Sequence, residues 1–200
     1  MSLRTGAVIV AAGLSLRMGT FKPLLKFGSV TIAQQIIITL HQAGASPVVV
    51  VAGYNADMFE KHVSHMGAVC LRNEHYADSQ MLDSAKIGLA FIQRHCDRVL
   101  FTPVDIPLFT NNTIKMLLAE DGPVALPVYE GIEGHPLLIS SVLIPSILDY
   151  SGDNGLEGAI KSCGKEKRLV PVKDDGVLFD VDTPEDYQEL MHRHTKNTCE

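Results

Sequence analysis

The sequence predicts an α/β fold, a doubly wound three-layer α/β/α sandwich whose mainly parallel sheet includes one antiparallel strand. Short runs that are apolar on both faces alternate with amphipathic segments of roughly 10–15 residues, which is the pattern of βαβ units. Glycine, proline or a capping residue marks most of their ends. With 200 residues and a hydrophobic content of 46%, the chain is expected to form one domain over 1–200.

The first half of the chain is expected to contain three buried strands and two helices. In order these are a strand at 7–12, a helix at 32–43, a strand at 47–52, a helix at 55–63 and a strand at 68–72. Thr31 can cap the first helix and Gly44 can end it. The turn-rich stretch 13–30 follows the first strand, at the carboxyl end where α/β folds bind ligands.

The second half repeats this alternation. Helices are expected at 80–94, 110–119, 141–149, 156–163 and 183–194, and strands at 98–102, 123–128, 135–139, 168–172 and 177–180. The strand at 135–139 follows a turn at 129–134 and is expected to return antiparallel. Thr183 and Pro184 suit the cap and the first position of the last helix, and the polar tail 195–200 is expected to be flexible.

Composition excludes several classes of protein. A net charge of −6 argues against a nucleic-acid-binding protein. The four cysteines show neither paired nor zinc-ligand spacing, which favours thiols in a reducing compartment. The apolar segment 6–16 superficially resembles a signal peptide, but Gly13 and Ser15 interrupt it and Arg17 follows, so a buried first strand explains it better. Because no run is long enough to span a membrane, a cytoplasmic protein is expected.

Positive charge is concentrated at the N-terminal end. No Asp or Glu precedes Asp57, whereas the same segment contains Arg4, Arg17, Lys22 and Lys26. One interpretation is that this segment forms a binding site for a polyanionic small molecule. The other is that apolar strand and helix faces left no room for acidic residues.

The loop at 11–25, AAGLSLRMGTFKPLL, favours the first interpretation. Its glycines let the backbone approach a ligand and bind an anion, while Arg17 can clamp phosphate oxygens and Lys22 can add a point charge. The loop contains neither G-x-G-x-x-G nor G-K-[ST], which argues against a dinucleotide-dependent oxidoreductase and a P-loop. The alternative is a plain surface loop with two solvated cations, although loops of this length usually have a function.

Two acidic segments also follow predicted strands. Asp105, in TPVDIP, suits a Mg²⁺ ligand, and the alternative is an aspartate that opens a turn. Asp180 and Asp182, in FDVDTPED, would share one face of an extended segment. The alternative for Asp182 is a polar residue before the helix cap.

The loop sequence A-A-G-x-S-x-R-M-G-x-x-K-P-L-L closely resembles the signature of the MobA-like NTP transferase family, which includes molybdenum-cofactor cytidylyl- and guanylyltransferases. The resemblance extends over about residues 7–192 and implies a Rossmann-like nucleotidyltransferase fold. It also implies that the loop wraps a triphosphate, with Arg17 and Lys22 on the phosphates. The nucleotide-binding residues that it implies are Ala11, Ala12, Gly13, Arg17, Gly19, Lys22, Ser79 and Ser84.

The same resemblance implies a metal site. Asp105 matches the family's D-x-P motif and Asp182 its D-[IV]-D-T-P-E-D motif, so both are expected to bind Mg²⁺, with Asp180 as an uncertain supporting residue. Together with Arg17 and Lys22, Asp105 is expected to be catalytic.

An acceptor site is implied by two further motifs. His135 and Pro136 match a G-[HN]-P motif, and Asp153 lies in a sequence that resembles a G-D-x-G loop. The alternatives are an ordinary strand-edge histidine and a plain turn. Asp83 departs from the small residue, and Lys26 from the less charged residue, that the family usually has at these positions. Both departures leave the preferred base of the NTP and the identity of the acceptor undetermined.

The implied reaction is in-line attack by an acceptor phosphate oxygen on the α-phosphorus of an NTP, with release of pyrophosphate. The A-A-G and D-V-D-T-P sequences resemble the CTP-using branch, which implies transfer of CMP to the phosphate of molybdenum-molybdopterin. The expected partners are an NTP, this phosphate-bearing pterin and, transiently, a molybdoenzyme or its chaperone, with no nucleic acid and no membrane. The alternatives are a guanylyltransferase of the same pathway, a sugar- or polyol-phosphate nucleotidyltransferase, and a non-catalytic nucleotide- or cofactor-binding accessory protein.

Overall fold

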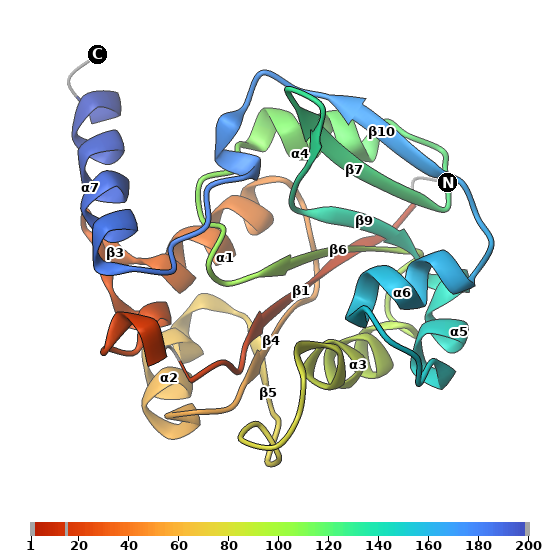
Figure 1. Cartoon of the computed structure of the whole chain (residues 1–200), viewed down its shortest axis with the longest axis horizontal. Helices are drawn as coiled ribbons and strands as arrows, with labels where there is room; N and C mark the ends of the chain where they lie inside the picture. The colour runs from red at the N-terminus through yellow and green to blue at the C-terminus, as the bar shows by residue number, and fades with distance from the viewer. Residues whose placement is uncertain (1–2, 15, 199–200) are drawn as a thin grey trace.

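In the computed structural model, which describes residues 3–14 and 16–198, a twisted sheet lies between two layers of helices (Figure 1). The strands of this sheet are β1 (Thr5–Ala11), β4 (Val48–Ala52), β5 (Val69–Arg72), β6 (Arg98–Pro103), β7 (Val124–Tyr129), β8 (Ile132–Glu133), β9 (Leu137–Ser140) and β10 (Lys167–Pro171). The α-helices are α1 (Ile32–Gln42), α2 (Ala56–Val63), α3 (Met81–Ile92), α4 (Asn111–Leu118), α5 (Ile144–Asp149), α6 (Gly155–Ser162) and α7 (Pro184–Thr198).

The sheet has the order β10-β7-β9-β6-β1-β4-β5, with β8 beside β7. β1 pairs in parallel with β4 and β6, whereas β9 pairs antiparallel with β6 and β7. This confirms the predicted α/β fold, and β9 is the antiparallel strand expected at 135–139. The chain runs from β1 outward to β5 and then crosses to β6 on the other side of β1. A ligand crevice is therefore expected at the carboxyl ends of β1 and β6.

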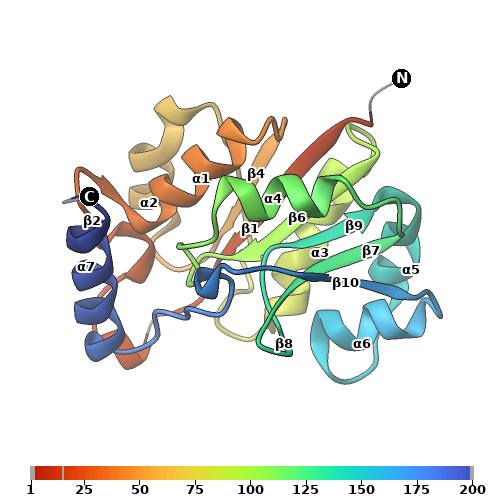
Figure 2. The same ribbon diagram turned by 90° about the horizontal axis from the view of Figure 1, so that it is seen from above.

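Alternation along the strands produces two hydrophobic cores. Ala7 and Ile9 of β1 pack toward α1, α2 and α4, whereas Val8 and Val10 pack toward α3, α5 and α6. Figure 2 shows these two sets of helices on opposite sides of the sheet. Because the central strands are covered on both faces, they are apolar at successive positions rather than at alternate ones.

One predicted strand, at 177–180, is wrong. Asp175–Val177 form a 3₁₀ turn, and residues 178–183 then form no strand pairing with the rest of the described chain. The backbone N–H of Val181 donates to the carbonyl of Asp105 at 2.9 Å. The backbone N–H of His135 also donates to the carbonyl of Val177 at 2.9 Å. These two bonds, rather than a ladder, hold the segment against the sheet.

The stretch 13–30 is more ordered than its turn-rich composition suggests. It contains 3₁₀ turns at Leu16–Met18 and Lys22–Leu24, followed by a hairpin of β2 (Lys26–Phe27) and β3 (Val30–Thr31). Helix α7 also exceeds its expected end at 194 and continues to Thr198. Positions 199–200 of the expected flexible tail lie outside the described residues.

Helix α7 holds the β2–β3 hairpin in place. The Tyr187 hydroxyl donates to the carbonyl of Lys26 at 2.8 Å, and the His194 ring lies 4.5 Å from the ring of Phe27. Gly28, with a φ of 61°, lies so close to the His194 ring that a Cβ would clash with it. The hairpin that follows Lys22 is therefore fixed by a helix from the other end of the chain.

Among the described residues, no helix has both the length and the apolar character that a membrane span requires.

Gly88 allows α3 to pack closely on β1, and we expect Gly88→Val to destabilise the protein. A Cβ at this position would lie 2.5 Å from Cγ1 of Val8 and 3.1 Å from Cγ2 of Val51. Overpacking of this kind lowers the free energy of unfolding by about 2–3 kcal/mol, which urea denaturation will measure. Ala90→Ser, on the exposed face of the same helix, is the matched control, and an equal effect of both changes would contradict this account.

Candidate active site

A cleft of about 430 Å³ opens at the carboxyl ends of β1 and β6. Its walls come from the loops that follow these two strands, from the start of α3 and from the segment before α7. The predicted site residues that line it are Ala11, Ala12, Gly13, Arg17, Lys22, Ser79, Ser84, Asp105 and Asp182. Gly19 does not line the cleft: it has a φ of 65° and supplies a left-handed turn in the loop.

The loop after β1 directs two cations toward one carboxylate. Met18 is buried and anchors the loop, which leaves Arg17 exposed beside it. Lys22 is only 6% exposed, at the start of a 3₁₀ turn whose second residue is Pro23. The Lys22 ammonium lies 2.7 Å from Oδ1 of Asp182, and the Arg17 guanidinium lies 2.6 Å from Oδ2 of the same residue.

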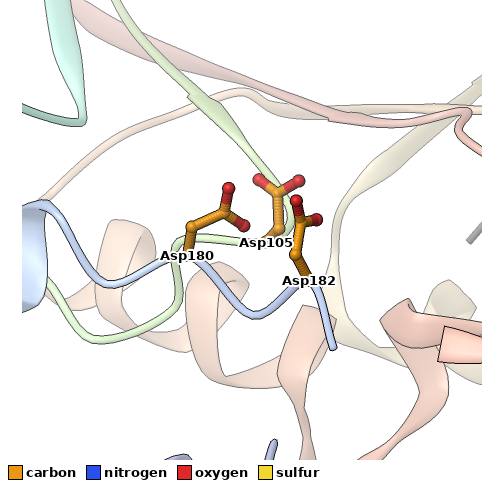
Figure 3. A group of neighbouring side chains, drawn as sticks. All are labelled: Asp105, Asp180 and Asp182. Carbon is orange, nitrogen blue, oxygen red and sulfur yellow. The ribbon is translucent and has the colours of Figure 1, made fainter. Parts of the chain in front are cut away.

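Asp105 completes this group from the end of β6. Its Oδ2 lies 3.5 Å from Nζ of Lys22. Oxygens of Asp105, Asp180 and Asp182 lie within 4.8 Å of one another, and Figure 3 shows the three carboxylates gathered from two segments of chain. Val181 is fully buried and bonded to the Asp105 carbonyl, so the aspartates on either side of it both point toward Asp105.

The start of α7 fixes the backbone next to Asp182. A single oxygen of Asp186, Oδ2, accepts hydrogen bonds from the backbone N–H of Asp182 at 3.0 Å and of Thr183 at 2.7 Å. In return, the Thr183 hydroxyl oxygen accepts from the N–H of Asp186 at 3.2 Å. These bonds form a reciprocal helix cap. The Thr183 hydroxyl also donates to Oδ2 of Asp186 at 2.8 Å, and this bond, followed by the one from the Thr183 backbone N–H, holds the pKa of Asp186 below its usual value.

Negative charge exceeds positive charge at the centre of the site. Loss of water around Asp180, followed by repulsion from Asp105 and Asp182, raises the pKa of Asp180 to about 6, although Lys22 and Arg17 act in the opposite direction. Three carboxylates on firmly held backbone are hard oxygen donors of the kind that Mg²⁺ and similar divalent cations prefer. The donor set therefore fits a metal ion, and it includes Asp180 beside the two ligands that the sequence predicted.

A second cavity, of about 410 Å³, adjoins the cleft across Gln80 and Met81, which line both. Its walls are mainly apolar side chains of β6, β7, β9 and α6, and His135 lies among them. Nδ1 of His135 is buried and has no hydrogen-bond partner in the described part of the chain. Burial lowers the pKa of His135, which favours a neutral imidazole.

The other two predicted acceptor residues do not line this cavity. Pro136 is buried beside it, and Asp153 lies in an exposed loop where its carbonyl accepts from the Tyr150 hydroxyl at 2.7 Å. Asn154 and Gly155, which follow Asp153 and begin α6, line the cavity instead.

Sequence reasoning missed several residues of the cleft. Tyr76, Gln80 and Met81 line it without belonging to a recognised motif. Asn73 is a buried polar residue directly after β5. It does not line the cleft itself, but its side chain bonds to Ser79 and Ser84, which do. Like Asp105, it directly follows a strand at the edge of the sheet where ligands bind, and this position was the available signal.

Residues 7–169 match the family described as MobA-like NTP transferase domain. The chain belongs to this family. It is 28% identical over 193 residues to the molybdenum cofactor cytidylyltransferase of Escherichia coli K12, with 94% of this chain and 96% of that protein covered. The fold is similar to that of a Methanothermobacter nucleotidyl transferase (22% identity, TM-score 0.85, covering 97% and 99% of the two chains). It is also similar to that of Rv0371C from Mycobacterium tuberculosis, solved as a complex with manganese (22% identity, TM-score 0.78, covering 94% and 98%).

The pKa of Asp180 predicts a pH-dependent effect of Asp180→Asn on stability in the presence of EDTA. The folded-state pKa of about 6 exceeds the unfolded value of about 3.9, so the protonated carboxyl stabilises the wild type at low pH. This contribution is lost as the pH rises through 6. The unfolding free energy of the variant should therefore rise relative to the wild type between pH 4 and 7, by no more than about 1 kcal/mol because the residue is exposed.

Urea denaturation at several pH values measures this difference. Asp121→Asn, in an exposed loop remote from the site, is the matched control and should follow the wild type. A constant difference between Asp180→Asn and the wild type at all pH values would contradict the electrostatic explanation.

Proposed function

We propose that this protein is a Mg²⁺-dependent nucleotidyltransferase that transfers CMP from CTP to the phosphate of molybdenum-loaded molybdopterin and releases pyrophosphate. The observation that carries the proposal is the meeting of Lys22, Asp105 and Asp182 in a cleft that adjoins a second, mainly apolar cavity. Two adjoining cavities suit a reaction between two bound substrates. The name of the 28% identical relative supports the choice of CTP and of the pterin acceptor.

The donor nucleotide occupies the first cleft in this proposal. The Ala11–Gly13 segment and the Ser79 and Ser84 hydroxyls surround the base, while Arg17 and Lys22 contact the phosphates. At an effective dielectric constant of about 20, each close pair of like charges repels by roughly 4 kcal/mol. Two phosphate-bearing substrates therefore need the cations that the loop supplies.

Asp105 and Asp182, with Asp180 beside them, would hold the metal ion. When bound, Mg²⁺ supplies neutralisation of charge on the phosphates and on the departing pyrophosphate. Lys22 would contact the phosphates beside this ion, because its ammonium lies next to both Asp105 and Asp182.

The acceptor occupies the second cavity. Its apolar walls suit a flat ring system, and the imidazole of His135 lies among them. A phosphate oxygen is already a nucleophile and requires no general base. The work of the protein is therefore to align the two substrates and to stabilise charge.

The cellular setting is part of the proposal. The three described cysteines are free thiols, which supports a reducing compartment such as the cytoplasm. Delivery of the product would require a transient contact with a molybdoenzyme or its chaperone.

Pyrophosphate release tests the proposal directly. The protein is incubated with Mg²⁺, molybdenum-loaded molybdopterin and CTP, GTP, ATP or UTP in turn, and we expect release with CTP above all. Release with GTP would instead indicate a guanylyltransferase. Release only when a sugar or polyol phosphate replaces the pterin would change the acceptor, and the absence of any nucleotide binding would refute the proposal.

Asp105→Asn should lower Mg²⁺-dependent turnover at least about 100-fold, because it removes one negatively charged ligand from the proposed metal site. Circular dichroism and thermal unfolding establish that the variant is folded, and turnover is measured over a range of Mg²⁺ concentrations. Asp149→Asn, at the exposed end of α5, is the matched control. Full activity of Asp105→Asn would show that this carboxylate does not hold the metal.

A further inference from the structure

Asn73 is a buried side chain whose two polar atoms can be told apart by their partners. It follows β5 directly and is 4% exposed. Its backbone N–H donates to the carbonyl of Ala52 at 2.8 Å, and its Oδ1 accepts from the backbone N–H of His75 at 3.0 Å. Because a backbone N–H can only donate, the atom that faces His75 is the oxygen and the other is the NH₂ group.

The NH₂ group of Asn73 holds two serine hydroxyls. Nδ2 donates to Oγ of Ser79 at 2.8 Å and to Oγ of Ser84 at 2.9 Å. An amide nitrogen has no lone pair to offer, so both hydroxyls must act as acceptors toward it. Neither hydroxyl has another hydrogen-bond partner within residues 3–14 and 16–198, so both protons are available to a ligand.

Both serines line the cleft at which the donor nucleotide is proposed to bind. Ser84 is itself buried, on the first turns of α3, and Ser79 lies on the loop just before this helix. A ligand in the cleft therefore meets two neighbouring hydroxyls whose protons are unused, and it can satisfy both by presenting two neighbouring acceptors.

We infer that Asn73 is a positioning residue that sets the base preference of this cleft, by holding the Ser79 and Ser84 hydroxyls as a pair of donors toward a pyrimidine edge with two adjacent acceptors. This inference rests on the proposed function. Cytosine has such an edge, because its O2 and N3 both accept hydrogen bonds. Uracil has a donor at N3, which opposes one of the two hydroxyl protons. The Watson–Crick edge of guanine has donors at N1 and N2, and guanine has two adjacent acceptors only at O6 and N7, on an edge that no pyrimidine has.

Asn73→Asp tests the inference because it changes the polarity of one atom and little else. One carboxylate oxygen can still accept from the N–H of His75, but the other can only accept from the two serines. The serine protons then turn inward, and lone pairs face the cleft. CTP should lose about tenfold in affinity relative to UTP, whose N3–H now meets an acceptor.

The measurement is the ratio of the dissociation constants of CTP and UTP, by calorimetry with Mg²⁺. Because both nucleotides carry the same triphosphate, the added negative charge of the aspartate weakens both alike and cancels in the ratio. A general loss of structure in the variant would also lower the affinity for CTP and for UTP by the same factor. Thr39→Val, which removes a buried hydroxyl within α1, is the control for altered stability and should leave the ratio unchanged.

The outcomes separate the inference from the proposed function. A wild type that binds CTP above UTP, together with a ratio that shifts in Asn73→Asp, supports the inference. An unchanged ratio, or a wild type that prefers GTP, overturns it and leaves nucleotidyl transfer standing. A wild type that binds no nucleotide overturns both.

A second variant keeps the test valid if Asn73→Asp does not fold. The double substitution of Ser79→Ala and Ser84→Ala removes both hydroxyls and leaves the amide in place. The preference for CTP over UTP should fall by a similar factor, and its retention in a folded double variant would overturn the inference.

Discussion

The architecture of the site depends on one buried cation, the ammonium group of Lys22. An ammonium group in the interior is costly unless it is closely paired, and Lys22 is paired with Asp182 at 2.7 Å and Asp105 at 3.5 Å. The three residues come from the loop after β1, the end of β6 and the segment before α7. Pairing thus requires the chain to bring its first, middle and last parts to one edge of the sheet, which is the edge that the strand order selects for ligand binding. The lysine is at once a structural counter-ion and a cation that lines the cleft.

The apolar and capping contacts around the site make this pairing possible. Met18 and Val181 are buried next to the charged residues Arg17 and Asp182, so hydrophobic burial helps to hold each charged side chain in place. The cap at Thr183 fixes the segment that carries Asp182. The contact of α7 with the β2–β3 hairpin fixes the chain that follows Lys22. Lys22 and Arg17 do not balance three carboxylates. Loss of water around Asp180, together with repulsion from Asp105 and Asp182, raises the pKa of Asp180. The same excess of negative charge suits a divalent cation.

Most of the fold could be predicted from the sequence because its determinants are local. Strands buried on both faces are uniformly apolar, and caps such as Thr31 are bonded to their own helices. The strand expected at 177–180 is wrong because only isolated backbone bonds, from His135 to Val177 and from Val181 to Asp105, hold this part of the chain against the sheet. The alternation of Asp180 and Asp182 therefore does not mark a strand. The loop motif indicated which side chains line the cleft, but not that Gly19 serves only to turn the backbone. The membership of Asp180 in the carboxylate group depends on tertiary distances, which no local pattern reports.

Segment 73–84 shows how one short stretch can connect recognition of the two proposed substrates. Its first residue, Asn73, orients two serines toward the first cleft, and Gln80 and Met81 form the wall that the cleft shares with the second cavity. Gln80 is also fixed by the helix, since its N–H donates to the side chain of Asp83 at 2.8 Å. A base bound at the serines would thus lie against the same backbone that borders the proposed acceptor cavity. Asp83, which departs from the small residue expected there, contacts this wall through its bond with Gln80. The unusual residue at position 83 therefore contacts the wall between the two cavities, where the two proposed substrates would have to be aligned.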